Sequence, residues 1–149
     1  MNVNPVVSWV LRSPLHRLLS RSTMLVRYTA RKSGREISLP VNYVAEGENL
    51  WVLSVGKRSW WRNFRQPAPA TLRLRGCEVA AQGEVITDEA AQLSGMAAFV
   101  KGMPQVARYL KIWFDEKGEP DADDLREAMK GRVLLRFTNR DRARTVSQE

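Results

Sequence analysis

Two short cation-rich segments hold the residue types that bind anionic groups in proteins. The first, residues 31–35 (RKSGR), lies between two predicted strands. It places three cations, a hydroxyl and a conformationally permissive glycine in one tight turn, where backbone N–H groups can form an anion nest that the cations close. Because any hairpin can carry basic residues for solubility, this turn alone does not establish an anion site.

The second segment, residues 56–63 (GKRSWWRN), follows an almost wholly apolar stretch that is typical of a strand buried on both faces. It offers a glycine for close approach, two cations, and a short helix whose predicted cap, Ser59, would give it a start that favours anions. The adjacent Trp60 and Trp61 can wall an aromatic ring. Alternatively, Trp60 and Phe64, four residues apart, can plug the end of a barrel. We expect that for one tryptophan and not for both, because neighbours in sequence cannot share one helix face.

Other residues with reactive side chains have simpler explanations. His16 has no carboxylate three or four residues away, and Cys77 has no histidine beside it. The acids between Asp115 and Asp124 lack the spacing of a calcium loop and fit a solvated helix start. One Cys and one His give no usual zinc site, and neither common nucleotide-binding glycine motif is present. We therefore nominate no catalytic side chain and no metal ligand.

Five strands are predicted in tandem within residues 24–86. Residues 24–30 and 37–44 alternate apolar and polar side chains on either side of the RKSGR turn, and residues 50–55 form the apolar strand. Residues 71–75 and 79–86 form a hairpin around Gly76, after two prolines close the WWRN segment. Strands joined mostly by short turns favour an antiparallel barrel over an alternating βαβ sheet.

Helical spacing dominates the second half of the chain. Residues 88–101, 104–113 and 121–130 each place apolar side chains on one face, with Gly102 stopping the first helix and Asp121 capping the third. A last strand, Arg132–Thr138, is expected to return to the barrel. The sequence thus predicts one α+β domain over residues 1–149, with about six strands. It also predicts an N-terminal helical segment over 1–22 and a frayed tail over 139–149.

The net charge of +8 is unevenly distributed. Residues 1–75 carry thirteen Lys and Arg against three Asp and Glu, whereas residues 76–149 carry eleven against thirteen. A basic half favours a localised anionic partner, such as nucleic acid, an anionic membrane surface or a phosphate-bearing small molecule, although a solvated basic surface is the simpler explanation. The basic amphipathic segment 5–20 could lie on a membrane or pack across the fold.

The sequence contains neither a predicted membrane-spanning helix nor a predicted secretory signal. No run of eighteen apolar residues exists to form a spanning helix, and the first segment has neither the basic start nor the cleavage site of a secretory signal. The single cysteine cannot form an internal disulfide. A reducing, cytoplasmic setting is therefore the default expectation.

Several motifs in a fixed order resemble the deazaflavin-dependent nitroreductase family, one of the split β-barrel flavin and deazaflavin oxidoreductases related to pyridoxamine phosphate oxidase. The motifs are Thr29-x-Arg31-Lys32-Ser33-Gly34-Arg35, Pro40-Val41-x-Tyr43, Gly47-x-x-Leu50-x-Val52, Trp60-Trp61-Arg62-Asn63 and the strand Thr71–Gly76. Each motif is short, but their order and spacing over roughly residues 13–87 make the combination fairly specific.

This resemblance implies a split β-barrel that binds reduced coenzyme F420, a deazaflavin, and delivers hydride to a quinone, a nitro compound or another activated alkene. It assigns the cofactor's phosphate and carboxylate tail to the two cation-rich segments, and its ring to the Pro40 strand and the WWRN helix. The implied cofactor-binding residues are Arg31, Lys32, Ser33, Gly34, Pro40, Ser54, Gly56, Lys57, Arg58, Trp60, Trp61 and Asn63. Tyr43, Tyr109 and Trp113 would lie on the substrate side.

Three functions remain open at this stage. The first is an F420H2- or flavin-dependent reductase of a small-molecule substrate, with FMN as the alternative cofactor. The second is a non-catalytic carrier of a flavin, tetrapyrrole or lipid on the same barrel. A nucleic-acid binder ranks last, because it needs exposed aromatic residues interleaved with cations along a groove, and the aromatic residues here cluster at predicted barrel ends. Related barrels often pair across a two-fold axis, so the resemblance also implies a homodimer.

Overall fold

The computed structural model describes residues 22–139. The predicted N-terminal helical segment, its membrane contact at residues 5–20 and the tail beyond Asn139 lie outside the described residues.

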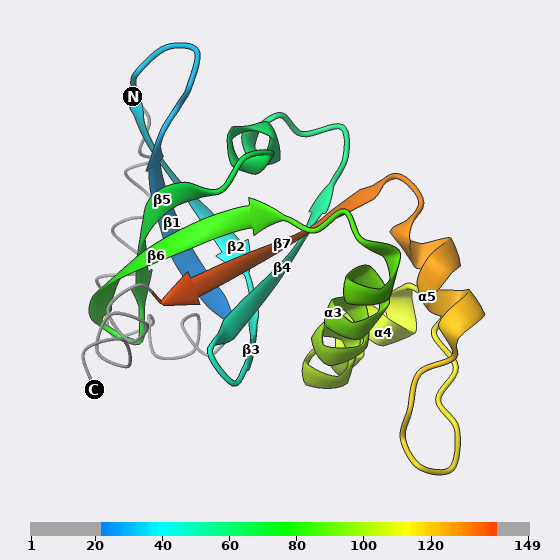
Figure 1. Ribbon diagram of the computed structural model, residues 1–149. Helices are drawn as coiled ribbons and strands as arrows, with labels where there is room; N and C mark the ends of the chain where they lie inside the picture. Colours follow the sequence, from blue (N-terminus) through cyan, green and yellow to red (C-terminus); the bar gives the residue numbers. More distant parts are fainter. Residues whose placement is uncertain (1–21, 140–149) are drawn as a thin grey trace, which may run out of the picture.

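Within residues 22–139, seven antiparallel strands curl into a split barrel, with three α-helices beside it (Figure 1). The strands run in the spatial order β2-β1-β5-β6-β7-β4-β3, so β2 and β3 are the two edges of the sheet. Their bounds are β1 Thr23–Thr29, β2 Glu36–Asn42, β3 Val44–Glu46, β4 Asn49–Val55, β5 Ala68–Leu74, β6 Cys77–Val85 and β7 Arg132–Asn139. The expected α+β class and antiparallel barrel are confirmed, including the return of the last strand between β6 and β4.

The seventh strand arises because the stretch predicted as one strand over 37–44 divides at Tyr43. The pairing of β2 with β1 ends where Asn42 lies opposite Thr23. The backbone N–H of Tyr43 then donates to the carbonyl of Ser22 at 2.8 Å, and the next residues pair with β4 instead. A single stretch of alternating apolar and polar residues thus forms two strands, β2 paired with β1 and β3 paired with β4.

Strand β5 begins at Ala68 and includes Pro69, which the sequence had placed in the loop before it. Pairing between β1 and β5 covers only Thr71–Arg73 of β5, so Pro69 has a hydrogen-bonded neighbour on the β6 side alone. A proline is tolerated there because its missing N–H removes no ladder bond.

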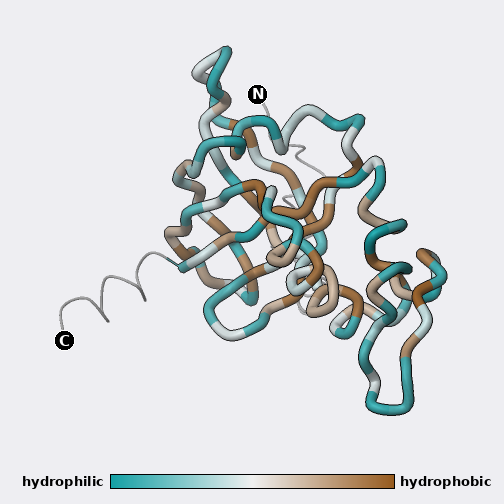
Figure 2. Tube along the Cα trace, turned by 45° about the vertical axis from the view of Figure 1, so that its right-hand side comes forward, coloured by the Kyte–Doolittle hydropathy of each residue, from teal (hydrophilic) through white to brown (hydrophobic). Residues whose placement is uncertain are grey.

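Two apolar clusters lie on opposite faces of the sheet. Adjacent residues of β7 show the division, since Phe137 and Leu135 are fully buried inside the barrel whereas Leu134 is fully buried against the helices. Side chains of neighbouring strand residues point to opposite faces, which explains how one strand serves both clusters. Hydrophobic residues follow the strands and the helices, whereas the turns are hydrophilic (Figure 2).

The helices cover one end of the sheet. Helix α3 (Glu89–Gly102) begins after Asp88, whose carboxylate accepts a hydrogen bond from the N–H of Ala91 at 2.9 Å. Helix α4 is Pro104–Tyr109, and α5 (Ala122–Met129) is capped by Asp121 as predicted. No helix in the range 22–139 is long and apolar enough to cross a bilayer.

Helix α4 ends four residues before the predicted end at 113. The N–H of Lys111 donates to Arg108 and that of Ile112 to Ala107, which is the pattern of a Schellman C-terminus. Lys111 takes the left-handed conformation, with φ 59°, that glycine usually fills. Because lysine stands where glycine is usual, no stop signal was visible in the sequence, and the buried Ile112 anchors the turn.

Candidate functional site

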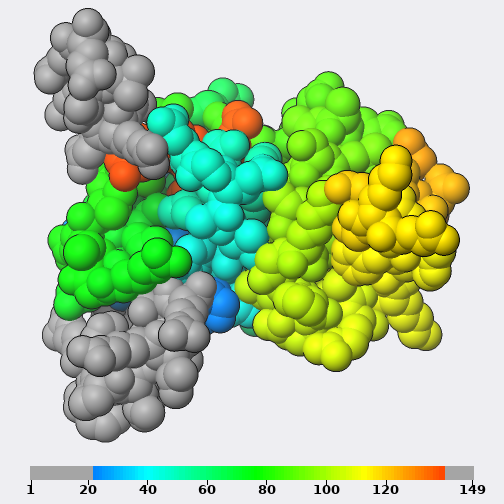
Figure 3. Space-filling model, turned by 90° about the horizontal axis from the view of Figure 1, so that it is seen from below, coloured from blue at the N-terminus to red at the C-terminus, as the bar shows by residue number. Residues whose placement is uncertain are grey.

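A pocket of about 510 Å³ opens at the seam of the split barrel, between β2, β4 and the helices α3 and α4. Strand β2 pairs only with β1, and β4 beyond Trp51 pairs only with β7 within the described residues, so neither strand is paired across the seam. In Figure 3 the surface of β2 and β3, in cyan, adjoins that of α3 and α4, in yellow-green.

The lining of this seam pocket contains two arginines and no carboxylate. The cations are Arg58 and Arg132, and the uncharged polar groups are those of Thr23, Asn42, Ser54 and Tyr109. The rest of the wall is formed by Pro40, Val41, Leu53, Val55, Trp60, Phe99, Val106 and Leu110. Two guanidinium groups without an acid give the pocket a positive potential, which favours an anionic ligand with an apolar body.

Trp60 forms the wall where the pocket meets the end of the barrel. It belongs to the short 3-10 helix η1 (Trp60–Phe64), and its indole N–H donates to the hydroxyl of the buried Ser54 at 3.0 Å. Its ring packs edge-on against Phe64, with the centroids 6.1 Å apart. Phe64 in turn contacts Tyr28, whose pKa is raised by burial, and Phe137. The predicted plug of the barrel is confirmed for Trp60 and Phe64.

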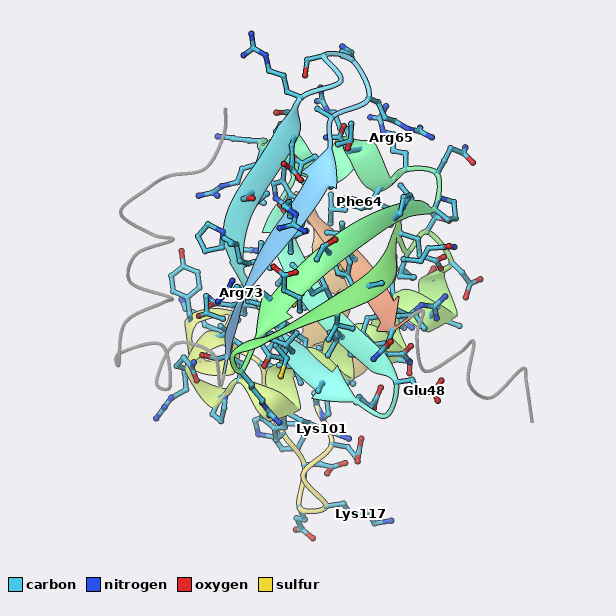
Figure 4. All side chains as sticks on the ribbon, turned by 90° about the vertical axis from the view of Figure 1, so that its left-hand side faces the viewer. Glu48, Phe64, Arg65, Arg73, Lys101 and Lys117 are labelled. Carbon is cyan, nitrogen blue, oxygen red and sulfur yellow. The ribbon has the colours of Figure 1, made fainter. Side chains whose placement is uncertain are left out.

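Trp61 points elsewhere, as expected for the second tryptophan. Its ring lies beside the guanidinium groups of Arg62 and Arg65, at 5.6 and 5.2 Å from the ring centroid, and its indole N–H donates to the carbonyl of Gly56 at 3.2 Å. Figure 4 shows Arg65 beside the turn between β1 and β2, at the end of the barrel opposite Lys101 and Lys117. Trp61 does not line the seam pocket.

The RKSGR turn is hydrogen-bonded to η1 and contributes no residue to the pocket lining. Three of its backbone N–H groups already have partners within the chain, because Arg31 donates to Asn63 Oδ1, Gly34 to the Ala30 carbonyl and Arg35 to the Ser33 hydroxyl. The amide of Asn63 also donates to the carbonyl of Trp60 at 2.9 Å. Asn63 therefore braces the turn against η1.

The short helix begins directly after Ser59, as predicted, but the side-chain cap expected of Ser59 is absent. The element that follows is a five-residue 3-10 helix, and Ser59 makes no side-chain cap hydrogen bond. So short an element has no sizeable dipole, because the dipole grows from aligned peptide units. Lys57 and Arg58 are therefore the groups of this loop that carry positive charge for an anion.

The structure brings five of the predicted site residues together in the pocket lining: Pro40, Ser54, Arg58, Trp60 and Tyr109. Gly56 and Lys57 lie in the loop directly before Arg58 but do not line the pocket. Trp61 and Asn63 belong to η1 itself, and Arg31, Lys32, Ser33 and Gly34 belong to the RKSGR turn; none of these six residues lines the pocket. Tyr43 is 3% exposed in the barrel core and Trp113 is 64% exposed, and neither lines the seam pocket.

Sequence reasoning missed Arg132, Thr23, Asn42 and Phe99 as lining residues. Arg132 was at the start of a predicted strand, but the neighbour of that strand was not predicted. Asn42 and Thr23 are register partners across β1 and β2, joined by a hydrogen bond of 3.1 Å between their side chains. Among residues 22–139, no three His, Cys, Asp or Glu side chains gather closely enough to hold a metal ion.

Comparison with known proteins shows similarity at the level of structure. No protein-family model and no curated protein sequence matches the chain. The FAD and heme binding protein from Mycobacterium smegmatis is 14% identical with a TM-score of 0.52, covering 85% of this chain and 66% of that one.

Two other solved structures are similar to the same extent. An F420-H2 dependent reductase (FDR-A) is 16% identical with a TM-score of 0.51, over 77% of this chain and 94% of that one. The conserved hypothetical protein Rv2991 from Mycobacterium tuberculosis is 15% identical with a TM-score of 0.51, over 94% of this chain and 81% of that one. Identities this low establish the arrangement of the backbone and not an activity. The chain therefore has the α+β split-barrel fold that these proteins share.

Proposed function

We propose that this chain binds a phosphate-bearing flavin or deazaflavin in the seam pocket and is an oxidoreductase. Its cofactor would be reduced F420, with FMN as the alternative, and its acceptor a quinone, a nitro compound or another activated alkene. The observation that carries the proposal is the lining of the seam pocket, where Arg58 and Arg132 stand beside an indole and an apolar wall with no carboxylate.

The residues present fit such a cofactor. A volume of about 510 Å³ lies within the roughly 300–1,000 Å³ typical of small-molecule pockets. The guanidinium groups match a phosphate, for which arginine's planar fork of donors is suited. Trp60, held by its hydrogen bond to Ser54, offers a ring surface of fixed orientation. Phe99 and Val106 bring apolar surface from the two helices that would exclude water from a bound ring.

When bound, the cofactor supplies the hydride, so the chain needs no nucleophile of its own. The part of this chain is to bind, orient and shield. Arg58 would hold the phosphate, Trp60 and Pro40 would position the ring, and Tyr109, which is 78% exposed at the pocket, would meet the acceptor from solvent.

Lys32 and Arg31 would contact the cofactor only if it extends beyond the pocket. They belong to the RKSGR turn, outside the pocket lining, so the phosphate of FMN bound at Arg58 would not meet them. F420 carries carboxylates beyond its phosphate, and such a tail could cross η1 to the RKSGR turn. The carrier alternative uses the same pocket without turnover.

Two of the solved structures with the same fold support this ligand class, because one is an F420-H2 dependent reductase and the other an FAD and heme binding protein. Haem finds less support, because the seam-pocket lining contains no His, Cys or Met to ligate iron and offers only the exposed Tyr109. The homodimer remains a prediction of the resemblance, which light scattering would test.

The test is to titrate the full chain with F420 and with FMN while following tryptophan emission. Trp60 should be quenched by a ring beside it, and Trp60→Phe should lose that part of the quenching, whereas Trp113→Phe is the matched control outside the pocket. The protein is then mixed with reduced F420 and a nitro compound or quinone, and absorbance at about 420 nm is followed for reoxidation. Binding without reoxidation by any acceptor favours the carrier. No binding of either cofactor at high micromolar concentration contradicts both.

A further inference from the structure

Arg132 lies where two loops of the barrel meet. It is the first residue of β7 and pairs in register with Val55, the last residue of β4. The chain then turns after β4, with the N–H of Arg58 donating to the carbonyl of Val55 at 3.1 Å. Val55 thus holds both arginines, Arg58 through this turn hydrogen bond and Arg132 through strand pairing, although 74 positions separate the two in sequence.

A glycine-to-glycine contact locks these two loops together. The N–H of Gly56 donates to the carbonyl of Gly131 at 2.9 Å. A Cβ atom at Gly56 would lie 3.1 Å from that same carbonyl oxygen, and Gly131 has φ +73°, which side chains rarely adopt. Both positions therefore favour glycine, and the contact fixes the backbones that carry the two arginines.

The guanidinium of Arg132 is held at one end and available at the other. Its Nη1 donates to the carbonyl of Ala128 at 2.9 Å, in the last turn of α5, where a cation is favoured by the helix dipole. A guanidinium has five N–H donors, so most remain for a ligand. Within residues 22–139, neither Arg132 nor Arg58 forms a salt bridge, and both line the seam pocket.

We propose that Arg132 and Arg58 form a two-guanidinium clamp for the phosphate group of the pocket ligand, and that Arg132 sets the preference for phosphorylated over phosphate-free ligands. The identity of that ligand as a flavin or deazaflavin rests on the proposed function. The clamp itself requires only a phosphomonoester or pyrophosphate. Its physical basis is that two arginines fixed on rigid backbones lose little freedom when they bind a tetrahedral anion.

Inorganic pyrophosphate tests the clamp without any cofactor. Its affinity is measured by calorimetry for the wild-type chain, Arg132→Gln, Arg132→Lys and Arg108→Gln. Arg108 lies on α4 outside the seam pocket and has no salt bridge among the described residues, so its variant makes the same charge change at a distance. We expect a loss of roughly ten- to a hundred-fold in Arg132→Gln, a smaller loss in Arg132→Lys, and less than about twofold in Arg108→Gln.

The pair FMN and riboflavin, which differ only by the phosphate, tests the preference. The ratio of their affinities should be high in the wild type and should fall in Arg132→Gln through weaker FMN binding alone. Equal pyrophosphate affinity in wild type and Arg132→Gln, or no pyrophosphate binding at all, would overturn the clamp. If pyrophosphate binds but no flavin or deazaflavin does, the clamp stands and the proposed function fails. An unchanged thermal melt in Arg132→Gln separates lost contacts from lost folding.

Discussion

Two arginines of strand β7 differ in what faces them across the sheet. Arg136 lies opposite Glu84 of β6, forms an ion pair with it and places its guanidinium 5.9 Å from the ring centroid of Trp51. Arg132, at the start of the same strand, lies opposite Val55 and lines the seam pocket, where no carboxylate is present. Burial alone does not separate them, since neither side chain is fully buried.

The same contrast holds between larger regions of the barrel. On the β1–β5–β6 face, Arg27 pairs with Glu36 and Glu78, and Arg73 lies near Glu78. Around η1 and the RKSGR turn, none of the seven cations, Arg31, Lys32, Arg35, Lys57, Arg58, Arg62 and Arg65, forms a salt bridge within the described chain. Cross-strand carboxylates hold arginines within the sheet, whereas cations without a carboxylate partner keep hydrogen-bonding capacity for a ligand.

The largest effect on binding is expected from Arg58→Gln. Removing one charge-assisted hydrogen bond to phosphate costs about 1.5–3 kcal/mol, so affinity for FMN or F420 should fall roughly ten- to a hundred-and-fifty-fold. Calorimetric titration measures this, and the melting temperature without ligand should stay within a degree or so of wild type because Arg58 makes no ion pair. Unchanged affinity would remove Arg58 from the site.

Arg136→Gln should show the opposite behaviour. It leaves the partly buried Glu84 without its cation and removes the contact with Trp51, so the free energy of unfolding should fall by about 1–3 kcal/mol. FMN affinity should not change. Urea denaturation followed by circular dichroism gives the stability, and Glu84→Gln with Arg136→Gln completes a cycle that isolates the pair. A loss of FMN affinity in folded Arg136→Gln would erase the contrast with Arg132.

Lys32→Ala should distinguish ligands by length. The RKSGR turn lies outside the pocket lining, so F420 with its carboxylate tail should bind about tenfold more weakly, while FMN should bind as before. Added salt should reduce the F420 difference, because a turn at the surface is screened by solvent. Affinities of both ligands at two salt concentrations provide the measurement. Equal weakening of FMN would mean that the turn reaches the phosphate itself.

The smallest effect is expected from Arg27→Gln. Its partners Glu36 and Glu78 are well exposed, and exposed ion pairs contribute about 0–1 kcal/mol. The free energy of unfolding should fall by less than about 1 kcal/mol, and ligand affinity should not respond. A loss as large as that of Arg136→Gln would show that the exposure of an ion pair does not determine how much it contributes to stability.

Local sequence was enough to predict most of the strands, the capped start of α5 and the packing of Trp60 with Phe64. All of these depend on local alternation, helical spacing or a capping side chain, which neighbouring residues specify. Pro40, Ser54, Arg58, Trp60 and Tyr109 were also predicted for the site, through motif resemblance, and the structure brings them into one lining.

Other features depend on contacts between distant parts of the chain. The end of α4 depends on a left-handed Lys111 and a buried Ile112, and the break at Tyr43 depends on where β1 stops offering partners. Arg132 became a pocket residue only through the pairing of β7 with β4 and the contact between Gly56 and Gly131. Its sequence neighbours are those of an ordinary strand residue. Antiparallel pairing over long sequence separations, set by burial of the two faces of the sheet, places Arg132 at the seam pocket and Arg136 beside Glu84.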